Sequence, residues 1–137
     1  MTLIIDSSFL VALYDGSEVH HPKAYDFAAH RSEAILVPDV VLPEVGYLLR
    51  RNLGYANSFN FFDFFDYSFV RLVPAFEEDL TRIYEISRQY ESAQFDIVDC
   101  CIMAIAERLN ITRIATFDRR DFSMFRPSHC EYLELLP

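Results

Sequence analysis

Glycine, proline and cysteine are all scarce in this sequence. Its 137 residues include 3 Gly, 6 Pro and 3 Cys, while 52% of them are hydrophobic and 24% are charged. This composition excludes a collagen-like, low-complexity or disordered chain. No internal repeat or linker-like stretch interrupts the sequence, so we expect residues 1–137 to form a single domain. At this length the core needs neither a disulfide nor a metal ion for its stability.

Long apolar runs are also absent. No stretch approaches the roughly 18 consecutive apolar residues that a membrane-spanning helix requires. The opening residues, MTLIID, have neither the positive flank nor the apolar stretch of an export signal. We therefore expect no membrane segment and a cytoplasmic protein.

The few cysteines form no recognisable framework. Cys100, Cys101 and Cys130 are odd in number and have no C-x-x-C spacing, which argues against both a disulfide scaffold and a zinc knuckle. We expect reduced thiols that are mostly buried.

Positive charge is limited. The 12 Lys+Arg residues stand against 21 Asp+Glu, which leaves a formal charge of -9. Such a balance disfavours a protein that binds nucleic acid through its overall charge, so a polyanionic substrate would need local cations. Nearly all of the basic residues are arginine, whose planar guanidinium group suits phosphate.

Short aliphatic runs alternate with stretches of helical spacing. Val98, Cys101, Ile105 and Leu109 recur at steps of three and four, and Asn110 then suits the end of a helix. The predicted strands cover residues 3–5, 35–37, 70–73 and 113–116, with a fifth candidate at 132–135. This alternation predicts an α/β fold, in which helices flank a central, mostly parallel sheet of four to five strands.

An aromatic segment spans residues 59–69, where seven of the residues are Phe or Tyr. These side chains point in too many directions for one helical face. They fit either a helix enclosed between the sheet and another helix, or an exposed dimer or partner interface.

Acidic residues follow three of the predicted strands. Asp6, Asp39 and Asp118 each come at or just after the end of an aliphatic run. In an open parallel sheet the ligand crevice lies outside the carboxyl ends of the strands, so these acids can converge on one site.

Three more acids have ordinary structural explanations. Asp96 can cap the helix that runs to Leu109, and Asp99 can lie in its first turn, where the helix dipole favours negative charge. Glu44 follows Pro43 in the first turn of another helix, where the same explanation holds.

Together, clustered carboxylates would need a cation. Two carboxylates about 5 Å apart repel by roughly 3 kcal/mol at an effective dielectric constant near 20. Such a cluster must take up protons or bind a cation. A hard divalent ion such as Mg²⁺ or Mn²⁺ suits a purely carboxylate site better than zinc does.

Two segments resemble the PIN-domain family. Residues 1–16, MTLIIDSSFLVALYDG, are similar to the opening of a PIN domain, with its first acid at Asp6 and hydroxyl residues after it. Residues 95–122 match more specifically, with an acid that opens an Ala-rich helix and a strand that ends in Thr-x-Asp. The resemblance covers almost the whole chain, implies a three-layer PIN-like fold, and is closest to the VapC-type toxins of toxin-antitoxin pairs.

The resemblance implies a set of site residues. Members of the family are Mg²⁺- or Mn²⁺-dependent ribonucleases whose metal-binding acids would correspond here to Asp6, Glu44, Asp99 and Asp118. Ser7 and Thr116 match hydroxyl positions that support these acids. Asp96 matches no family ligand, and we treat it as a cap or an accessory acid.

The implied function is a metal-dependent endoribonuclease that hydrolyses RNA phosphodiester bonds as the toxin of a type II toxin-antitoxin pair. Its partners would be RNA, a cognate antitoxin and a second copy of the chain. The pairs Arg50-Arg51 and Arg119-Arg120 follow two of the candidate ligands and are candidate RNA contacts, although a solvated or salt-bridged surface explains them equally well.

Two alternatives stay open. A PIN-like scaffold without catalysis could serve as a dimeric interaction module, as the aromatic segment and the acidic charge suggest. A phosphatase of the haloacid dehalogenase type also begins with an Asp at the end of its first strand, but it requires a second Asp where Ser8 stands here.

Overall fold

A computed structural model describes all residues from Met1 to Pro137, and its strands form one parallel sheet. The strand order is β3-β2-β1-β4-β5, and every neighbouring pair is parallel. The strands are β1 (Thr2–Ile5), β2 (Ala34–Pro38), β3 (Val70–Val73), β4 (Arg113–Ala115) and β5 (Glu134–Leu136). The predicted α/β architecture is confirmed. The fifth strand begins later than predicted, because its ladder with β4 pairs Arg113 with Glu134.

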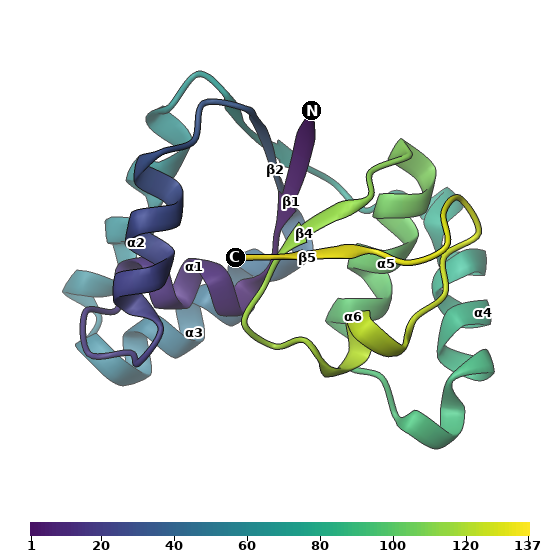
Figure 1. The fold of residues 1–137 in the computed structure, drawn as a ribbon. Helices are drawn as coiled ribbons and strands as arrows, with labels where there is room; N and C mark the ends of the chain where they lie inside the picture. The colour runs from purple at the N-terminus through teal and green to yellow at the C-terminus, as the bar shows by residue number, and fades with distance from the viewer.

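Helices cover both faces of this sheet. They are α1 (Ser7–Tyr14), α2 (His21–Ala29), α3 (Leu42–Leu53), α4 (Leu80–Gln89), α5 (Ile97–Leu109) and α6 (Arg120–Met124). Figure 1 shows the strands in the middle, with α1, α2 and α3 on one side and α4, α5 and α6 on the other. The predicted three-layer arrangement is therefore present. None of the helices has both the length and the apolar character that crossing a membrane requires.

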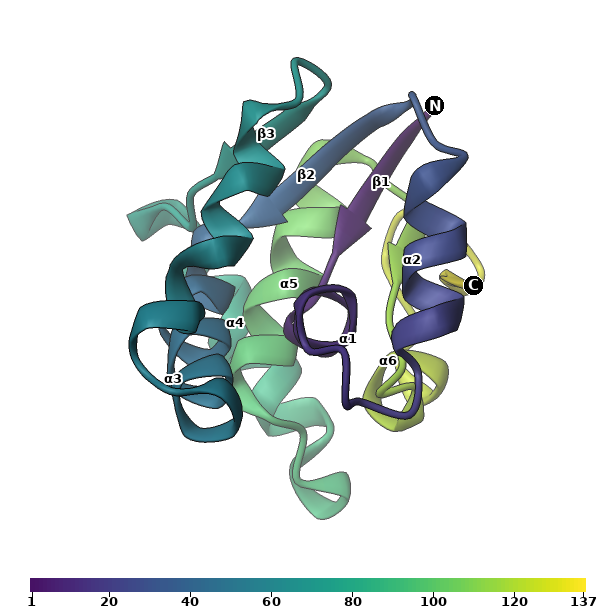
Figure 2. The same ribbon diagram turned by 90° about the vertical axis from the view of Figure 1, so that its left-hand side faces the viewer.

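The central strand explains the continuous aliphatic runs. β1 lies between β2 and β4, and Leu3, Ile4 and Ile5 are fully buried, as expected for a parallel strand that is covered on both faces. Figure 2 shows β1 beside β2, with α1 in front of the sheet and α5 behind it. All three cysteines are free, and Cys100 is fully buried.

Helix α5 begins and ends where its sequence predicts. Asp96 is the N-cap residue, and its carboxylate accepts a hydrogen bond of 2.8 Å from the Val98 backbone N–H. Asn110 ends the helix in the left-handed conformation, with φ of 56°, which Asn tolerates better than most residues. The capping role considered for Asp96 is confirmed, and it fixes where the first turn of α5 meets the sheet.

Most of the aromatic segment forms a 3₁₀ helix, η2 (Ala56–Asp66), which contacts α3 and β3. The interpretation as a helix enclosed between the sheet and another helix is thus only partly right, because several of its aromatic side chains stay exposed. A 3₁₀ helix has three residues per turn, so side chains three apart lie above one another. Phe61 and Phe64 accordingly lie in the core, whereas Phe59 and Phe62 are exposed. The segment therefore divides its aromatic side chains between the core and the surface.

Candidate active site

A pocket of about 430 Å³ opens at the carboxyl ends of β1 and β4. Its acidic wall consists of Asp6, Glu18, Glu44, Asp96, Asp99 and Asp118. Five of the six acids that the sequence suggested are thus brought to one pocket, which we call the acidic pocket, and Glu18 joins them without having been predicted. Asp39 is not among its lining residues. That acid begins the short helix η1 (Asp39–Val41) and accepts a hydrogen bond from the Ala75 backbone N–H, 3.1 Å away.

Asp6 joins the first strand to the first helix. It is the N-cap residue of α1, where its Oδ1 accepts hydrogen bonds from the Phe9 backbone N–H (3.0 Å) and the Ser8 hydroxyl (2.8 Å). Its Oδ2 accepts a hydrogen bond from Thr116 Oγ1. Burial raises the pKa of Asp6 to about 6, although these three hydrogen bonds act to lower it.

Asp99 is the second buried acid of the pocket. It lies in the first turn of α5 and is 9% exposed. Burial raises its pKa well above the ordinary value for an aspartate, and a hydrogen bond with Asp121 and repulsion from Asp6 act in the same direction. The two buried acids therefore disfavour each other's ionisation.

Two exposed acids complete the candidate ligand set. Glu44 lies in the first turn of α3, and its Oε2 accepts a hydrogen bond of 3.1 Å from Ser7 Oγ. Asp118 lies just beyond β4, and no protein group donates a hydrogen bond to its carboxylate. Ser7 thus supports one candidate ligand, and the Asp118 carboxylate is free to bind a ligand.

Ser8 and Thr116 hold the strand ends together. Ser8 Oγ accepts hydrogen bonds from the backbone N–H groups of Phe117 (2.9 Å) and Asp118 (3.3 Å) while it donates to Asp6. Thr116 Oγ1 accepts a further hydrogen bond of 3.0 Å from the Asp118 N–H. A supporting role was expected for Thr116 from the family resemblance, whereas none was expected for Ser8.

Asp121 is a second residue whose part the sequence analysis missed. It is buried, its Oδ2 accepts a hydrogen bond of 3.0 Å from the Asp96 backbone N–H, and it contacts Asp99. It therefore ties α6 to the start of α5. The one feature of the sequence that could have indicated a role for Asp121 at the site was its place three residues after Asp118.

No lysine or arginine lines the acidic pocket. Arg119 donates to the Pro137 carbonyl, and Arg120 donates to Asp121 Oδ1 at 2.8 Å. Arg51 donates to the neighbouring Asn52 side chain, and the Arg50 guanidinium lies 5.2 Å from the Tyr55 ring centre. These four arginines lie outside the pocket wall, and their role as RNA contacts stays a prediction.

The donor set of the acidic pocket consists of carboxylates, which are the ligands that Mg²⁺ and Mn²⁺ prefer. In the observed conformation, however, no group of three or more Asp, Glu, His or Cys side chains is close enough together to hold an ion. The chemistry of the residues fits a hard divalent cation, and an ion would have to draw at least some of these carboxylates closer.

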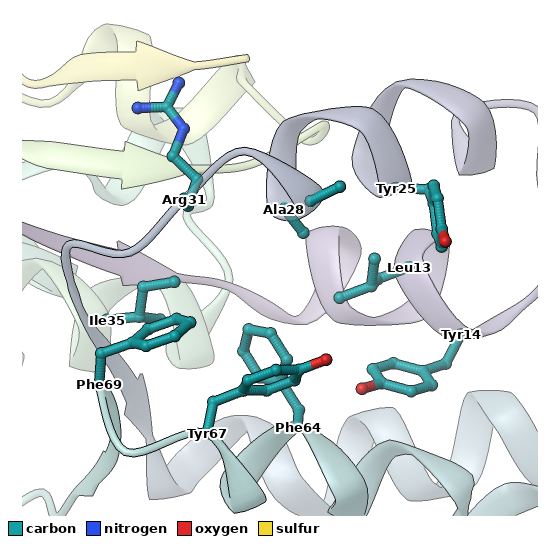
Figure 3. A pocket seen from close by; sticks show the side chains of 10 residues that line it. Leu13, Tyr14, Tyr25, Ala28, Arg31, Ile35, Phe64, Tyr67 and Phe69 are labelled. Carbon is teal, nitrogen blue, oxygen red and sulfur yellow. The ribbon is translucent and has the colours of Figure 1, made fainter.

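A second pocket, of about 310 Å³, differs from the acidic one in its chemistry. Figure 3 shows the rings of Tyr14, Phe64 and Tyr67 grouped together, with Leu13 near Tyr14 and Ile35 beside Phe69. Nine of its 10 lining residues are hydrophobic and none is acidic. This apolar pocket offers no set of ligands for a metal ion.

Comparison with known proteins agrees with this fold. A sequence model of the PIN domain matches residues 3–126. Ribonuclease VapC26 of Mycobacterium tuberculosis is 26% identical over 125 residues, which cover 91% of this chain and 93% of that protein.

Two solved structures share the fold. VapC20 of Mycobacterium tuberculosis, a toxin that cleaves the sarcin-ricin loop, superposes with a TM-score of 0.79 at 20% identity, covering 85% of this chain and 90% of that one. VapBC2 of Rickettsia felis, bound to a DNA fragment from its promoter, superposes with a TM-score of 0.70 at 17% identity. The match covers 98% of this chain and 97% of that one. The family match removes the haloacid dehalogenase alternative, and the chain belongs to the PIN-domain family.

Proposed function

We propose that this protein is a metal-dependent endoribonuclease that hydrolyses RNA phosphodiester bonds. The observation that carries the proposal is the acidic pocket, in which acids from β1, α3, α5 and the end of β4 meet without a neighbouring Lys or Arg. Elsewhere in the molecule a largely buried acid is paired with a cation, as Glu107 is with Arg82 at 2.5 Å.

The electrostatics of the pocket call for a cation. The pKa of Asp6 is raised to about 6 and that of Asp99 is raised further above its ordinary range, so ionising both at neutral pH is costly. A divalent ion would offset this cost. Asp6, Glu44, Asp99 and Asp118 would hold it, and Asp96 would add an accessory carboxylate at the rim.

When bound, Mg²⁺ or Mn²⁺ supplies activation of a water for in-line attack and neutralisation of charge on the phosphoryl group. The residues of the chain contribute positioning. Thr116 and Ser8 orient the Asp6 carboxylate, and the same two hydroxyls hold the backbone of Asp118. Ser7 orients Glu44. No side chain is needed as a covalent nucleophile.

We further propose that the protein is the toxin of a type II toxin-antitoxin pair that acts in the cytoplasm. Its similarity to ribonuclease VapC26, and the toxin-antitoxin complexes among the structures that share its fold, support this. A groove of about 370 Å³ between α3 and η2 is lined by Tyr47, Tyr55, Phe59 and Phe62. We assign this aromatic groove to protein partners, either the antitoxin or a second copy of the chain.

The alternative of a PIN-like interaction module without catalysis has less support. The aromatic groove agrees with it, but a module without a reaction has no use for a set of mutually repelling carboxylates in an open pocket. Calorimetric titration with Mn²⁺ separates the two, because a module without a metal site should give no saturable heat.

The test of the proposed reaction is cleavage by the purified protein. We expect it to cut a structured RNA when Mn²⁺ or Mg²⁺ is present and to be inactive with EDTA. Asp6→Asn and Asp99→Asn should each abolish cleavage while the circular dichroism spectrum stays unchanged. Asp26→Asn is the matched control, since Asp26 is an exposed acid on α2 outside the pocket. Full activity in either pocket variant would contradict the proposal.

A further inference from the structure

Three aromatic rings form a stack from the core to the edge of the acidic pocket. The Phe9 and Phe117 rings are parallel within 1° with centroids 5.7 Å apart, and the Phe117 and His20 rings are parallel within 3° at 4.5 Å. Phe9 is fully buried, Phe117 is half-buried and His20 is exposed. Phe117 stacks on one face of the imidazole, the residue stays exposed, and no other aromatic ring stacks on it.

His20 differs from the other histidines in what holds its ring. A ring nitrogen of His21 contacts the Ala12 carbonyl at 2.8 Å, and those of His30 and His129 contact backbone carbonyls in the same way. Neither ring nitrogen of His20 has such a partner. Its backbone N–H donates to Glu18, and Phe117 alone holds the ring by stacking. The imidazole of His20 therefore ties no two segments of the fold together by hydrogen bonds.

The stack supplies a contact that the rest of the pocket lacks. Phe117 and His20 are the only aromatic residues among the lining side chains, most of whose polar members are acids. An RNA strand that enters would find negative walls around any bound cation. Stacking on a base does not depend on the charge of the strand, and unpaired RNA bases are commonly bound on aromatic or histidine rings.

We propose that His20, supported by Phe117, is a stacking platform for an unpaired RNA base next to the bond that is cleaved. This inference rests on the proposed ribonuclease function and adds a base-binding subsite to it. The parallel Phe9 ring keeps Phe117 in place, so the platform is already formed before RNA binds. A rigid platform of this kind lowers the entropy cost of binding.

The test compares three variants on one substrate. The substrate is a single-stranded oligoribonucleotide that contains the cleavage site determined with the wild-type protein. Its cleavage by His20→Ala, His20→Phe and His30→Ala is measured in the presence of Mn²⁺. We expect His20→Ala to raise KM at least about fivefold with little change in kcat. His20→Phe should restore a KM close to that of the wild type, and His30→Ala, which alters an exposed histidine outside the pocket, should have no effect.

Abasic substrates identify the base. Each nucleotide on either side of the cut is replaced in turn by an abasic one. At one of these positions, removal of the base should weaken binding to the wild-type protein as much as His20→Ala weakens binding of the intact substrate. His20→Ala should bind that abasic substrate little more weakly than it binds the intact one. Thermal denaturation of each variant shows whether the segment between α1 and α2 stays folded.

Three outcomes would overturn the inference. The first is an unchanged KM in His20→Ala. The second is failure of His20→Phe to rescue together with a defect that shrinks at higher salt, since this indicates a charge contact with phosphate. The third is full additivity of His20→Ala with every abasic substitution. Each of these leaves the ribonuclease proposal intact, whereas a wild-type protein that cleaves no RNA would remove both proposals.

Discussion

Thr116 donates a hydrogen bond from its Oγ1 to Asp6 Oδ2 across 110 positions of sequence. This contact joins the end of β4 to the end of β1 and lowers the pKa of Asp6, which burial nevertheless keeps raised, at about 6. The ionised form of Asp6, which a cation requires, therefore depends on a hydroxyl from the other end of the chain.

We predict that Thr116→Val weakens Mn²⁺ binding by about tenfold at pH 7, because one lost hydrogen bond to a carboxylate raises its pKa and favours the proton over the metal. Stability should fall by about 1 kcal/mol. Calorimetric titration at two pH values checks this, since the defect should shrink at pH 8.5. Thr112→Val, which alters an exposed threonine just before β4, is the control. An equal defect at both pH values would contradict the explanation.

The stability of the metal-free protein should fall as pH rises. The folded-state pKa of Asp6, about 6, lies above the ordinary value of 3.8, and that of Asp99 is raised as well. Between these values the folded protein binds more protons than the unfolded chain, so the free energy of unfolding decreases with pH. The contribution of Asp6 is fully present below pH 4 and is lost above pH 6.

Thermal denaturation in EDTA between pH 5 and pH 8 measures this effect. Asp6 contributes about 3 kcal/mol in all, to order of magnitude, and roughly half of this should be lost between pH 5 and pH 8, because the rest is lost below pH 5. Asp6→Asn should reduce the slope, and saturating Mn²⁺ should reverse it, because the ion binds the ionised acids. A metal-free protein that becomes more stable toward pH 8 would contradict the raised pKa values.

The sequence could predict most acids of the pocket for a physical reason, although it gave no indication of Glu18. Asp6 and Asp118 follow strands, and the carboxyl ends of parallel strands meet at one edge of the sheet. Asp96 and Asp99 are placed by the start of a strongly patterned helix. Glu44 was indicated only by the family resemblance, since its local sequence fits a helix dipole partner equally well.

The remaining features of the site could not be predicted, because they depend on contacts between segments that are distant in the sequence. Ser8 holds the backbone of Phe117 and Asp118, more than 100 positions away, and no local pattern reports such a pair. The His20 stack is similar, because a histidine before a proline-containing helix is ordinarily a loop residue. The prediction that Asp39 joins the other acids was wrong. The chain turns into η1 directly after β2, and the Asp39 carboxylate accepts a hydrogen bond from the Ala75 N–H.

Ser8→Ala should be more damaging than Ser7→Ala. Ser8 contacts Asp6 and the backbone N–H groups of two later residues, whereas Ser7 contacts Glu44 alone. We expect Ser8→Ala to cost about 1–3 kcal/mol of stability, because it leaves the part-buried Phe117 N–H without a partner and removes one of the donors to the buried Asp6 carboxylate. Ser7→Ala should keep its stability within about 1 kcal/mol and weaken only Mn²⁺ binding. Urea denaturation checks the order, and equal losses in the two variants would contradict it.

Phe61 and Phe62 are neighbours in η2 but should have different roles. Phe61 is 2% exposed and Phe62 is 53% exposed, at the edge of the aromatic groove. Phe61→Ala should cost about 3–5 kcal/mol of stability, as for a buried phenylalanine, and lower the urea midpoint strongly. Phe62→Ala should change stability by less than about 1 kcal/mol, as for a surface position.

The second variant tests the assignment of the groove to protein partners. If two copies of the chain meet there, Phe62→Ala should shift the monomer–dimer equilibrium toward the monomer, because large exposed aromatic side chains contribute most to such interfaces. Sedimentation equilibrium of the wild type and both single variants, under conditions in which each is folded, measures the shift. Arg71→Ala alters an exposed residue on β3 that does not line the groove and should leave the equilibrium unchanged. If Phe62→Ala affects neither self-association nor binding of a co-expressed antitoxin, the groove is not a partner surface, and the exposure of Phe62 follows only from the threefold repeat of the 3₁₀ helix.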